Sequence, residues 1–332
     1  MKGTFIEKAL SPFMHLFWKT QIGILRACPP MYGIVCNAGL SAANSRRVWV
    51  KSFFMLALKA PGALLQNWRN KWKKRVVLSR VSISVTTRCT LNCDKCIAHI
   101  PDLNRHRNMP LSEITQDIQA LFSCVDHIYA VIISGGEAFL HPNLDEIVKI
   151  CADTGKAGHI SIQSNGTVIP GAKVLAALRE ANATVKISRY SPELQPEVET
   201  LKQILKANSV HYTHESSAFW RDISGFGQLQ AGSAKRRFSI CVEQLSVPYY
   251  YGKLHLCCES AILMKEGRIP EHESDYVDLR TIHPADFREQ WQRLLRKRSV
   301  FACAYCAGNT YRSARVSVAV QRETLKEGSG SV

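Results

Sequence analysis

The sequence predicts an α/β fold with a central parallel sheet, a basic helical N-terminal extension and a small cysteine-rich C-terminal domain. From residue 79, short apolar strands alternate with amphipathic helices, as in repeated βα units. Residues 1–80 carry 14 Lys and Arg against one acid, Glu7, whereas residues 81–332 have a net charge of only +3. The alternation stops near residue 232. We therefore divide the chain into 1–78, 79–232, 233–318 and a flexible tail over 319–332.

The extension over residues 1–78 is expected to be helical. Its segment 67–75 (NWRNKWKKR) mixes tryptophan with lysine and arginine, as in helices that lie on an anionic membrane surface. The alternative is a pair of helices that pack on the main domain and keep a solvated basic face. Nucleic acid is not an expected partner, because no nucleic-acid-binding motif accompanies the charge.

The middle segment provides the sheet. We expect strands at 80–86, 127–134, 159–164, 184–188 and 209–214, with helices between them at 110–124, 144–152, 172–182 and 192–207. Right-handed crossovers leave either a doubly wound sheet or a barrel. With a sixth strand near 222–230, the segment is too short for a complete eightfold barrel but long enough for a partial one. The loops after the strands meet at their carboxyl ends, where such folds build their sites.

Composition and the N-terminal sequence indicate the class of protein and its expected location in the cell. The chain has 332 residues, a net charge of +16 and 12 cysteines, which excludes a collagen-like, largely disordered or multi-span membrane protein. Lys8, His15 and Lys19 interrupt any signal-peptide core, and no stretch reaches about 18 uninterrupted apolar residues. We therefore expect a cytoplasmic protein, with peripheral contact at the inner membrane face as the open alternative. In that reducing compartment, clustered cysteines indicate metal or redox chemistry.

The first cysteine cluster is Cys89, Cys93 and Cys96, a C-x3-C-x2-C run directly after the first predicted strand. Three thiolates on one short loop can converge on three irons of a cubane cluster and leave the fourth iron open to a small molecule. A ferredoxin would supply a fourth cysteine, and none follows nearby. A zinc site completed by His99 and a set of free thiols are the two alternatives.

Two later strand ends add to this signal. The second strand closes with Ser134-Gly135-Gly136-Glu137, and glycine pairs at a strand end allow close approach to the backbone. The third strand closes at 163–167 (QSNGT). Each is an ordinary turn signal alone, whereas their order after the cysteine motif is specific.

Over residues of about 80–230, these motifs resemble the radical S-adenosylmethionine (SAM) superfamily. The resemblance implies a partial (β/α)6 TIM-like barrel and a [4Fe-4S] cluster on Cys89, Cys93 and Cys96 whose open iron chelates SAM. It also implies that the methionine amino group is held by Gly135, Gly136 and Glu137, and its carboxylate or the ribose by Asn165 and Ser188, with Arg189 as a weaker candidate. Lys95 departs from the family, which often has an apolar or aromatic residue there, near the adenine.

The second cysteine cluster is Cys241, Cys257, Cys303 and Cys306, in the pattern C-x10-G-x4-C…C-x2-C. By spacing alone, it suits a closed [4Fe-4S] site or a zinc site equally well. It resembles the start of a SPASM domain and, more closely, the shortened Twitch form, which implies one auxiliary [4Fe-4S] cluster. Cys258 is an alternative ligand to Cys257. The remaining thiols that we singled out are expected to be ordinary buried residues: Cys28, Cys36, Cys124 and Cys151.

The resemblance implies an enzyme that cleaves SAM reductively and removes a hydrogen atom from its substrate. A Twitch-bearing relative oxidises an aminocyclitol alcohol, so we expect oxidation of a small polar, carbohydrate-like substrate, with flavodoxin or ferredoxin as electron donor. The alternatives are a peptide-modifying SPASM enzyme and a non-catalytic zinc protein with a basic arm. The sequence assigns no catalytic residue. Two roles are open for the residues at the expected ends of later strands. They line a pocket for a polar substrate, or the tryptophan packs in the core and the charged residues form a surface ion pair: Glu215, Trp220, Arg221 and Asp222.

Overall fold

The computed structural model describes residues 61–215, 217, 219–223 and 232–322, and three short stretches of the extension at 19–20, 22–24 and 26–31. Most of the predicted basic extension therefore lies outside the described residues. The same holds for nearly all of the sixth strand expected at 222–230.

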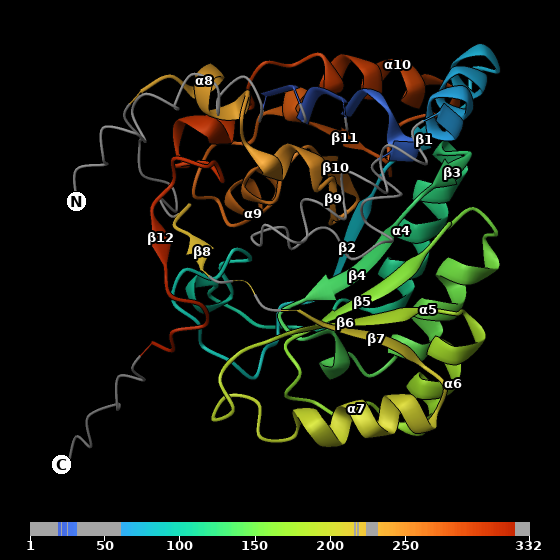
Figure 1. Cartoon of the computed structure of the whole chain (residues 1–332). Helices are drawn as coiled ribbons and strands as arrows, with labels where there is room; N and C mark the ends of the chain where they lie inside the picture. Colours follow the sequence, from blue (N-terminus) through green and yellow to red (C-terminus); the bar gives the residue numbers. More distant parts are fainter. Residues whose placement is uncertain are drawn as a thin grey trace.

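A parallel sheet forms the centre of the molecule (Figure 1). Its five βα strands lie side by side in chain order: β2 (Val81–Thr86), β4 (Val131–Gly135), β5 (Ile160–Ser164), β6 (Thr184–Ser188) and β7 (His211–Glu215). All four neighbouring pairs are parallel. This confirms the predicted α/β fold with a partial, TIM-barrel-like sheet. The expected strand at 127–134 is divided, because its first residues form β3 (His127–Ile128), which pairs with β1 (Val77–Leu78) instead.

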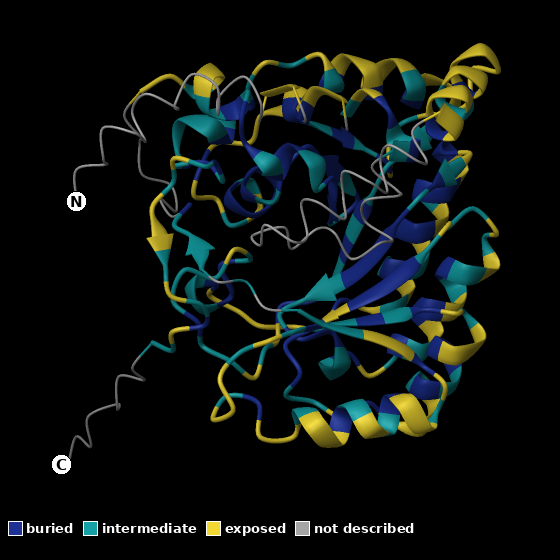
Figure 2. Ribbon diagram, viewed as in Figure 1, coloured by how far each residue is buried: buried dark blue, intermediate teal, exposed yellow. Residues whose placement is uncertain are grey.

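Four helices cover the outer face of this sheet (Figure 1). They are α4 (Leu111–Cys124), α5 (Leu144–Asp153), α6 (Ala172–Glu180) and α7 (Val198–Ala207). Their exposed and buried faces separate clearly in Figure 2, as the apolar periodicity predicts. Helix α7 begins at Val198 rather than at Pro192, because Pro196 disfavours helical geometry in the residue before it.

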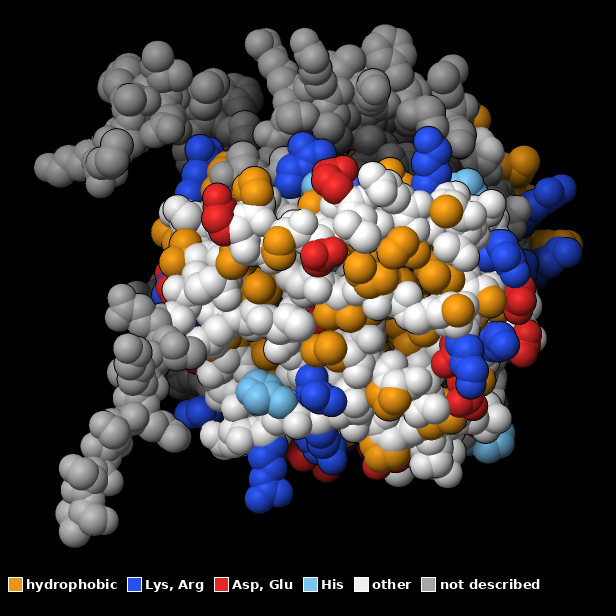
Figure 3. Space-filling view, turned by 90° about the horizontal axis from the view of Figure 1, so that it is seen from below, with side chains coloured by type: hydrophobic (Ala, Val, Ile, Leu, Met, Phe, Trp, Pro, Cys, Tyr) orange, Lys and Arg blue, Asp and Glu red, His pale blue; other side chains and the backbone are white. Residues whose placement is uncertain are grey.

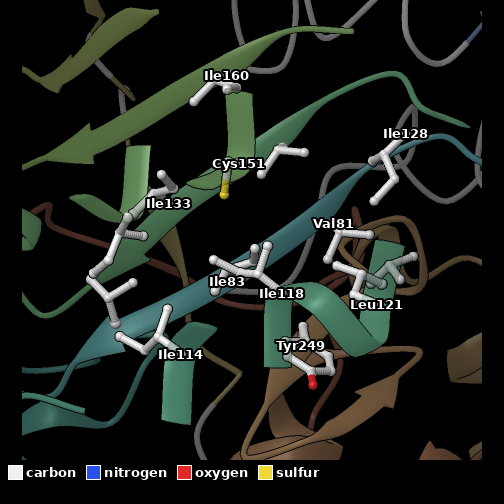
Figure 4. Close-up of a cluster of buried hydrophobic side chains, with 14 of the residues drawn as sticks. Val81, Ile83, Ile114, Ile118, Leu121, Ile128, Ile133, Cys151, Ile160 and Tyr249 are labelled. Atoms are coloured by element: carbon white, nitrogen blue, oxygen red, sulfur yellow. The ribbon is translucent and has the colours of Figure 1, made fainter. Parts of the chain in front are cut away.

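The core is formed where α4 packs on β2. Figure 4 shows Ile118 beside Ile83 and Leu121 beside Val81, and all four side chains are buried. Burying each such side chain contributes roughly 1.5–3 kcal/mol. This packing fixes the carboxyl end of β2, from which the first cysteine loop departs.

The C-terminal part extends the same sheet. The strands β9 (Pro248–Tyr250), β10 (Lys253–His255) and β11 (Tyr276–Asp278) continue it beyond β2, with β9 parallel to β2. The predicted small C-terminal domain therefore shares a sheet with the βα units. Its helices are α8 (Ala234–Phe238), α9 (Cys258–Lys265) and α10 (Pro284–Leu295). A separate antiparallel pair joins β8 (Trp220–Arg221) to β12 (Arg315–Val316), seen at the left of Figure 1.

In the described part of the extension, residues 61–72 are helical and pack on the 26–31 stretch. The Asn67 side chain donates to the Ala27 carbonyl at 3.1 Å, and the buried Cys28 thiol lies 3.7 Å from the Ala63 carbonyl. Across the residues that the structure describes, we find no helix with the length and apolar character needed to cross a membrane. On the face of the molecule seen in Figure 3, Asp and Glu lie among Lys and Arg, in keeping with the near-neutral body.

Candidate functional site

The three cysteines of the first cluster lie together on the loop that follows β2. Burial, together with the charges of the nearby Cys96 and Cys89, raises the pKa of the Cys93 thiol to about 11. Cys89 and Cys96 pack against the same small apolar cluster, formed by Ile100, Leu103 and Ile262. The loop also presents N–H donors to sulfur: the Leu91 amide lies 3.5 Å from the Cys89 Sγ.

The glycine motif packs directly on this loop. The Gly136 amide donates to the Thr86 carbonyl at 2.9 Å, and the Glu137 amide donates to the Arg88 carbonyl at 2.8 Å. A Cβ added to Gly136 would lie 2.3 Å from the Arg88 oxygen and 2.8 Å from the Cys89 Cβ. The glycine is therefore needed for the close approach of the chain's own cysteine loop, in addition to any ligand.

Glu137 is fully buried and joins the ends of two strands. One of its carboxylate oxygens accepts from the Phe139 amide at 3.0 Å, and the other accepts from the Asn165 amide at 2.7 Å and the Ser164 hydroxyl at 3.2 Å. Burial raises the pKa of Glu137 to about 7. Its carboxylate thus holds β5 against β4, and the motif has only its backbone to offer to a ligand amino group.

Asn165 and Ser188 lie at the ends of β5 and β6, where they were predicted. The Asn165 side-chain amide donates to the Thr90 hydroxyl at 3.0 Å and lies 3.5 Å from the Cys89 Sγ. Gln195, which the sequence analysis missed, links both strand ends. Its buried side chain donates to the Asn165 carbonyl at 2.5 Å and to the Ser188 carbonyl at 2.6 Å. The turn at Pro192–Pro196 was its only sequence signal.

Tyr190 is a second residue that the sequence did not single out. Burial raises its pKa to about 12, and the charges of Cys93, Cys96 and Cys89 act in the same direction. The Trp220 ring meets it edge-on, with ring centroids 6.2 Å apart. The two rings join the end of β6 to β8.

The other predicted pocket residues make structural contacts. Arg221 donates to the carbonyls of Tyr311 and Ser313, and Arg189 donates to the His214 carbonyl. The Lys95 ammonium group lies 3.5 Å from the carboxylate of Asp222, the residue that follows β8. The two side chains form an ion pair.

The C-terminal residues 319–322 were expected to be part of a flexible tail, and the structure differs. Ala319 is buried, and the Asp94 amide donates to the Val320 carbonyl at 2.6 Å. The Arg322 amide donates to the Asn92 carbonyl at 2.8 Å. These residues pair with the cysteine loop because it offers free backbone donors and acceptors. Residues 323–332 lie outside the described residues.

The second cysteine cluster lines one pocket. All four predicted thiols face it: Cys241, Cys257, Cys303 and Cys306. Burial raises the pKa of the Cys257 thiol, and the charges of Cys303, Cys241 and Cys306 act in the same direction. Cys258 instead packs on Ile100, Leu103 and Ile262, on the side of the first cysteine loop.

Three polar contacts surround this pocket. The Ser260 amide donates to the Cys257 Sγ at 3.4 Å, and the Gly308 amide donates to the Cys306 Sγ at 3.2 Å. The buried Glu259 lines the cavity and accepts from His99 at 2.7 Å, while its second oxygen has no hydrogen-bond partner. His99 is therefore engaged with Glu259 and Asp102, rather than with the three thiols that it was considered to complete.

Within the described residues, no group of His, Cys, Asp or Glu is arranged to hold a single metal ion. A zinc ion needs its sulfur ligands within about 2.3 Å of the metal, which is a tighter arrangement than a four-iron cluster requires. This observation concerns sites for a single metal ion. The two groups of thiols can still be ligands of iron–sulfur clusters.

Residues 83–213 match the model of the radical SAM superfamily. The chain is 28% identical over 100 residues to 7,8-dihydro-6-hydroxymethylpterin dimethyltransferase of Methanocaldococcus jannaschii, which covers 30% of this chain and 20% of that protein. It is 28% identical over 144 residues to GTP 3',8-cyclase of Limosilactobacillus fermentum, which covers 40% of this chain and 42% of that protein. The chain therefore spans less than half the length of either relative.

Among solved structures, the chain is similar to BtrN in complex with AdoMet and 2-DOIA. That similarity has 17% identity and a TM-score of 0.49, and it covers 74% of this chain and 97% of the other. Streptococcus suis SuiB bound to the precursor peptide SuiA is similar at 13% identity with a TM-score of 0.35, over 50% of this chain and 38% of the other.

Proposed function

Residues 83–213 form a radical SAM domain, and on this premise we propose that the chain is an enzyme that cleaves SAM reductively. The observation that carries the proposal is the first cysteine loop, which holds three neighbouring thiols and packs against the glycine motif at Arg88 and Cys89. When bound, a [4Fe-4S] cluster with SAM supplies a 5′-deoxyadenosyl radical that removes a hydrogen atom from a substrate carbon. Cys89, Cys93 and Cys96 would hold the cluster.

The chain's own residues orient the cofactor and shield it. The glycine motif presents backbone groups at the end of β4, because the Glu137 carboxylate is already satisfied by three donors. Asn165 and Ser188 lie on the two following strand ends, where we propose contacts to the SAM carboxylate or ribose. We also propose that the Tyr190 and Trp220 rings, which meet edge-on, limit the access of water to the site.

We further propose that Cys241, Cys257, Cys303 and Cys306 hold an auxiliary [4Fe-4S] cluster in a Twitch-like domain. Four thiols that line one buried cavity support this, as do the N–H donors aimed at two of the sulfurs. Hydrogen bonds of this kind are common around cluster ligands and tune the potential. Cys257, which faces the cavity, is the proposed ligand rather than Cys258.

The proposed reaction is oxidation of a small polar, carbohydrate-like substrate. After a hydrogen atom has left a carbinol carbon, the remaining radical reaches the ketone by losing one electron and giving one proton to water. An auxiliary cluster would accept that electron. A flavodoxin or ferredoxin in the cytoplasm would supply the electron for SAM cleavage. The alternatives remain modification of a peptide and, outside enzymes, a zinc protein.

Metal analysis and SAM turnover of anaerobically reconstituted protein test the proposal. We expect about eight irons per chain, and 5′-deoxyadenosine formation with dithionite that is lost when Cys89, Cys93 and Cys96 are all replaced by alanine. The same variant should keep about four irons at the second site. Cys124→Ala, in which a buried thiol on α4 is replaced, is the matched control and should turn over normally. Zinc without iron would refute the enzyme proposal.

We also propose peripheral contact of the extension with an anionic membrane. On the 61–72 helix, Trp68 and Trp72 are 60% and 72% exposed and stack with ring centroids 6.3 Å apart. Leu64 and Leu65 beside them are more than half exposed. Five basic residues follow closely: Arg69, Lys71, Lys73, Lys74 and Arg75. Each basic residue near an anionic surface contributes about 1 kcal/mol.

Liposome co-sedimentation tests this contact. The full chain should pellet with vesicles that contain phosphatidylglycerol and should not pellet with pure phosphatidylcholine, and high salt should release it. The double variant Trp68→Ala/Trp72→Ala should bind more weakly. Ile169→Ala, which removes an exposed hydrophobic side chain from the body, is the control. Equal pelleting with both kinds of vesicle would contradict the proposal, and so would no pelleting with either.

A further inference from the structure

The last described residues close over the first cysteine loop. Cys93 and Gln321 form an antiparallel bridge, which the backbone bonds from Asp94 to Val320 and from Arg322 to Asn92 flank on both sides. A segment more than two hundred residues away in the sequence therefore lies on the loop that carries the thiols. In this position a side chain can reach a cluster ligand directly.

Gln321 makes that contact. Its side-chain N–H donates to the Cys93 Sγ at 3.2 Å and to the Ala319 carbonyl at 2.7 Å, while its side-chain oxygen accepts from the Asn92 amide at 2.8 Å. The Asn92 amide is a donor only, so the oxygen must face it and the NH2 group must face the sulfur. The direction of the hydrogen bond to sulfur is thereby fixed by the backbone.

Arg322 anchors the same segment. Its guanidinium group binds the Asp102 carboxylate through two hydrogen bonds of 2.8 and 3.2 Å and lies 3.5 Å from Asp94. Two-point pairing of this kind restricts the orientation of both partners. Asp94 and Asp102 precede and follow Cys96 in the sequence. Through these two contacts Arg322 holds the neighbouring Gln321 at the cysteine loop.

We propose that Gln321 is a positioning residue that tunes the reduction potential of the cluster held by Cys89, Cys93 and Cys96, which rests on the proposed function. Reduction adds a negative charge to the cluster and its sulfur ligands. An N–H donor at a ligand sulfur stabilises this reduced form more than the oxidised form, so it raises the potential. The C-terminal segment would thus make delivery of the electron for SAM cleavage easier.

Redox titration of the full-length reconstituted protein, followed by electron paramagnetic resonance, tests this. Gln321→Leu removes the donor and should shift the potential of the first cluster to more negative values. Gln321→Glu keeps the oxygen that faces Asn92 but sets a carboxylate against the sulfur, so its shift should be larger. The auxiliary cluster is an internal reference and should not shift. Gln292→Leu, on the exposed side of α10, is the matched control.

The order of potentials, wild type above Gln321→Leu above Gln321→Glu, supports the proposal, because a merely structural role gives no such order. Equal potentials in all three proteins would overturn it. If Gln321→Leu does not load iron at the first site, the comparison of wild type with Gln321→Glu decides. Failure of the proposed function looks different: the wild type itself would then lack the iron that the triple cysteine variant should lose.

Discussion

Gly136 offers a sharp test of how the glycine motif and the cysteine loop depend on each other. In Gly136→Ala, the new Cβ would lie 2.3 Å from the Arg88 oxygen, 2.8 Å from the Arg88 carbonyl carbon and 2.8 Å from the Cys89 Cβ. The first two neighbours are backbone atoms, which cannot turn away as a flexible side chain would. The loop that carries Cys89 must therefore move away from the end of β4.

The expected loss of folding free energy has two parts, the steric strain and the weakening of hydrogen bonds that must lengthen. Overpacking by one methyl group costs roughly 1–3 kcal/mol, and weakening one hydrogen bond, such as that from Glu137 to Arg88, costs about 1 kcal/mol. The sum is about 2–4 kcal/mol. At roughly 2 °C per kcal/mol for a chain of this size, we expect the Tm to fall by about 4–8 °C. Because the loop moves, iron loading at the first site should fall as well.

Thermal unfolding and iron content of the reconstituted protein measure both effects. The second site is lined by other residues and should keep its four irons. Gly171→Ala is the control, because a Cβ on Gly171 meets no atom within 4 Å and its φ of −71° suits alanine. Full iron loading and an unchanged Tm in Gly136→Ala would refute the reasoning, since the contact would then be too loose to matter.

Three further predictions follow from buried groups. Cys257→Ser should lose the auxiliary cluster, measured by iron content, whereas Cys258→Ser should keep it, because only Cys257 faces the cavity. Burial raises the pKa of Glu137 to about 7, above the ~4.3 of an unfolded glutamate, so the folded state binds more protons between these values. Stability should therefore fall by up to a few kcal/mol as the pH rises through this window, and a Tm series should show a flatter profile for Glu137→Gln. Arg280, which is partly exposed, pairs with the buried Asp117 at 2.7 and 3.0 Å, so Arg280→Met should destabilise the fold by about 1–3 kcal/mol in denaturant titration, and adding Asp117→Asn should recover part of the loss.

Local patterns in the sequence were sufficient for the βα units. Strands β2, β5 and β6 appear as short apolar or alternating runs, and α4 and α5 as apolar positions three and four residues apart. Both patterns arise because side chains that are near in sequence share one buried face. They can therefore be recognised without knowing which element packs against that face.

Contacts between distant segments were not predictable in this way. The turn before α7 was visible as prolines, but nothing in it shows that Gln195 reaches back to Asn165. Likewise, residues 319–322 look like the start of a polar tail, and only pairing with the cysteine loop gives Gln321 a position. The four thiols of the second cluster were found by spacing, whereas the choice of Cys257 over Cys258 depends on which side of α9 faces the cavity.

The pairing of β9 with β2 has a consequence for how the protein is made. At roughly 5–20 residues per second, the ribosome adds β9 on the order of ten seconds after β2. Until then, one edge of β2 presents unpaired N–H and C=O groups, which other chains can use as a template for aggregation. A shorter expression fragment that ends near residue 232 would keep this edge open permanently. We therefore expect soluble production of the βα half to depend on including the residues up to β11, which complete the sheet.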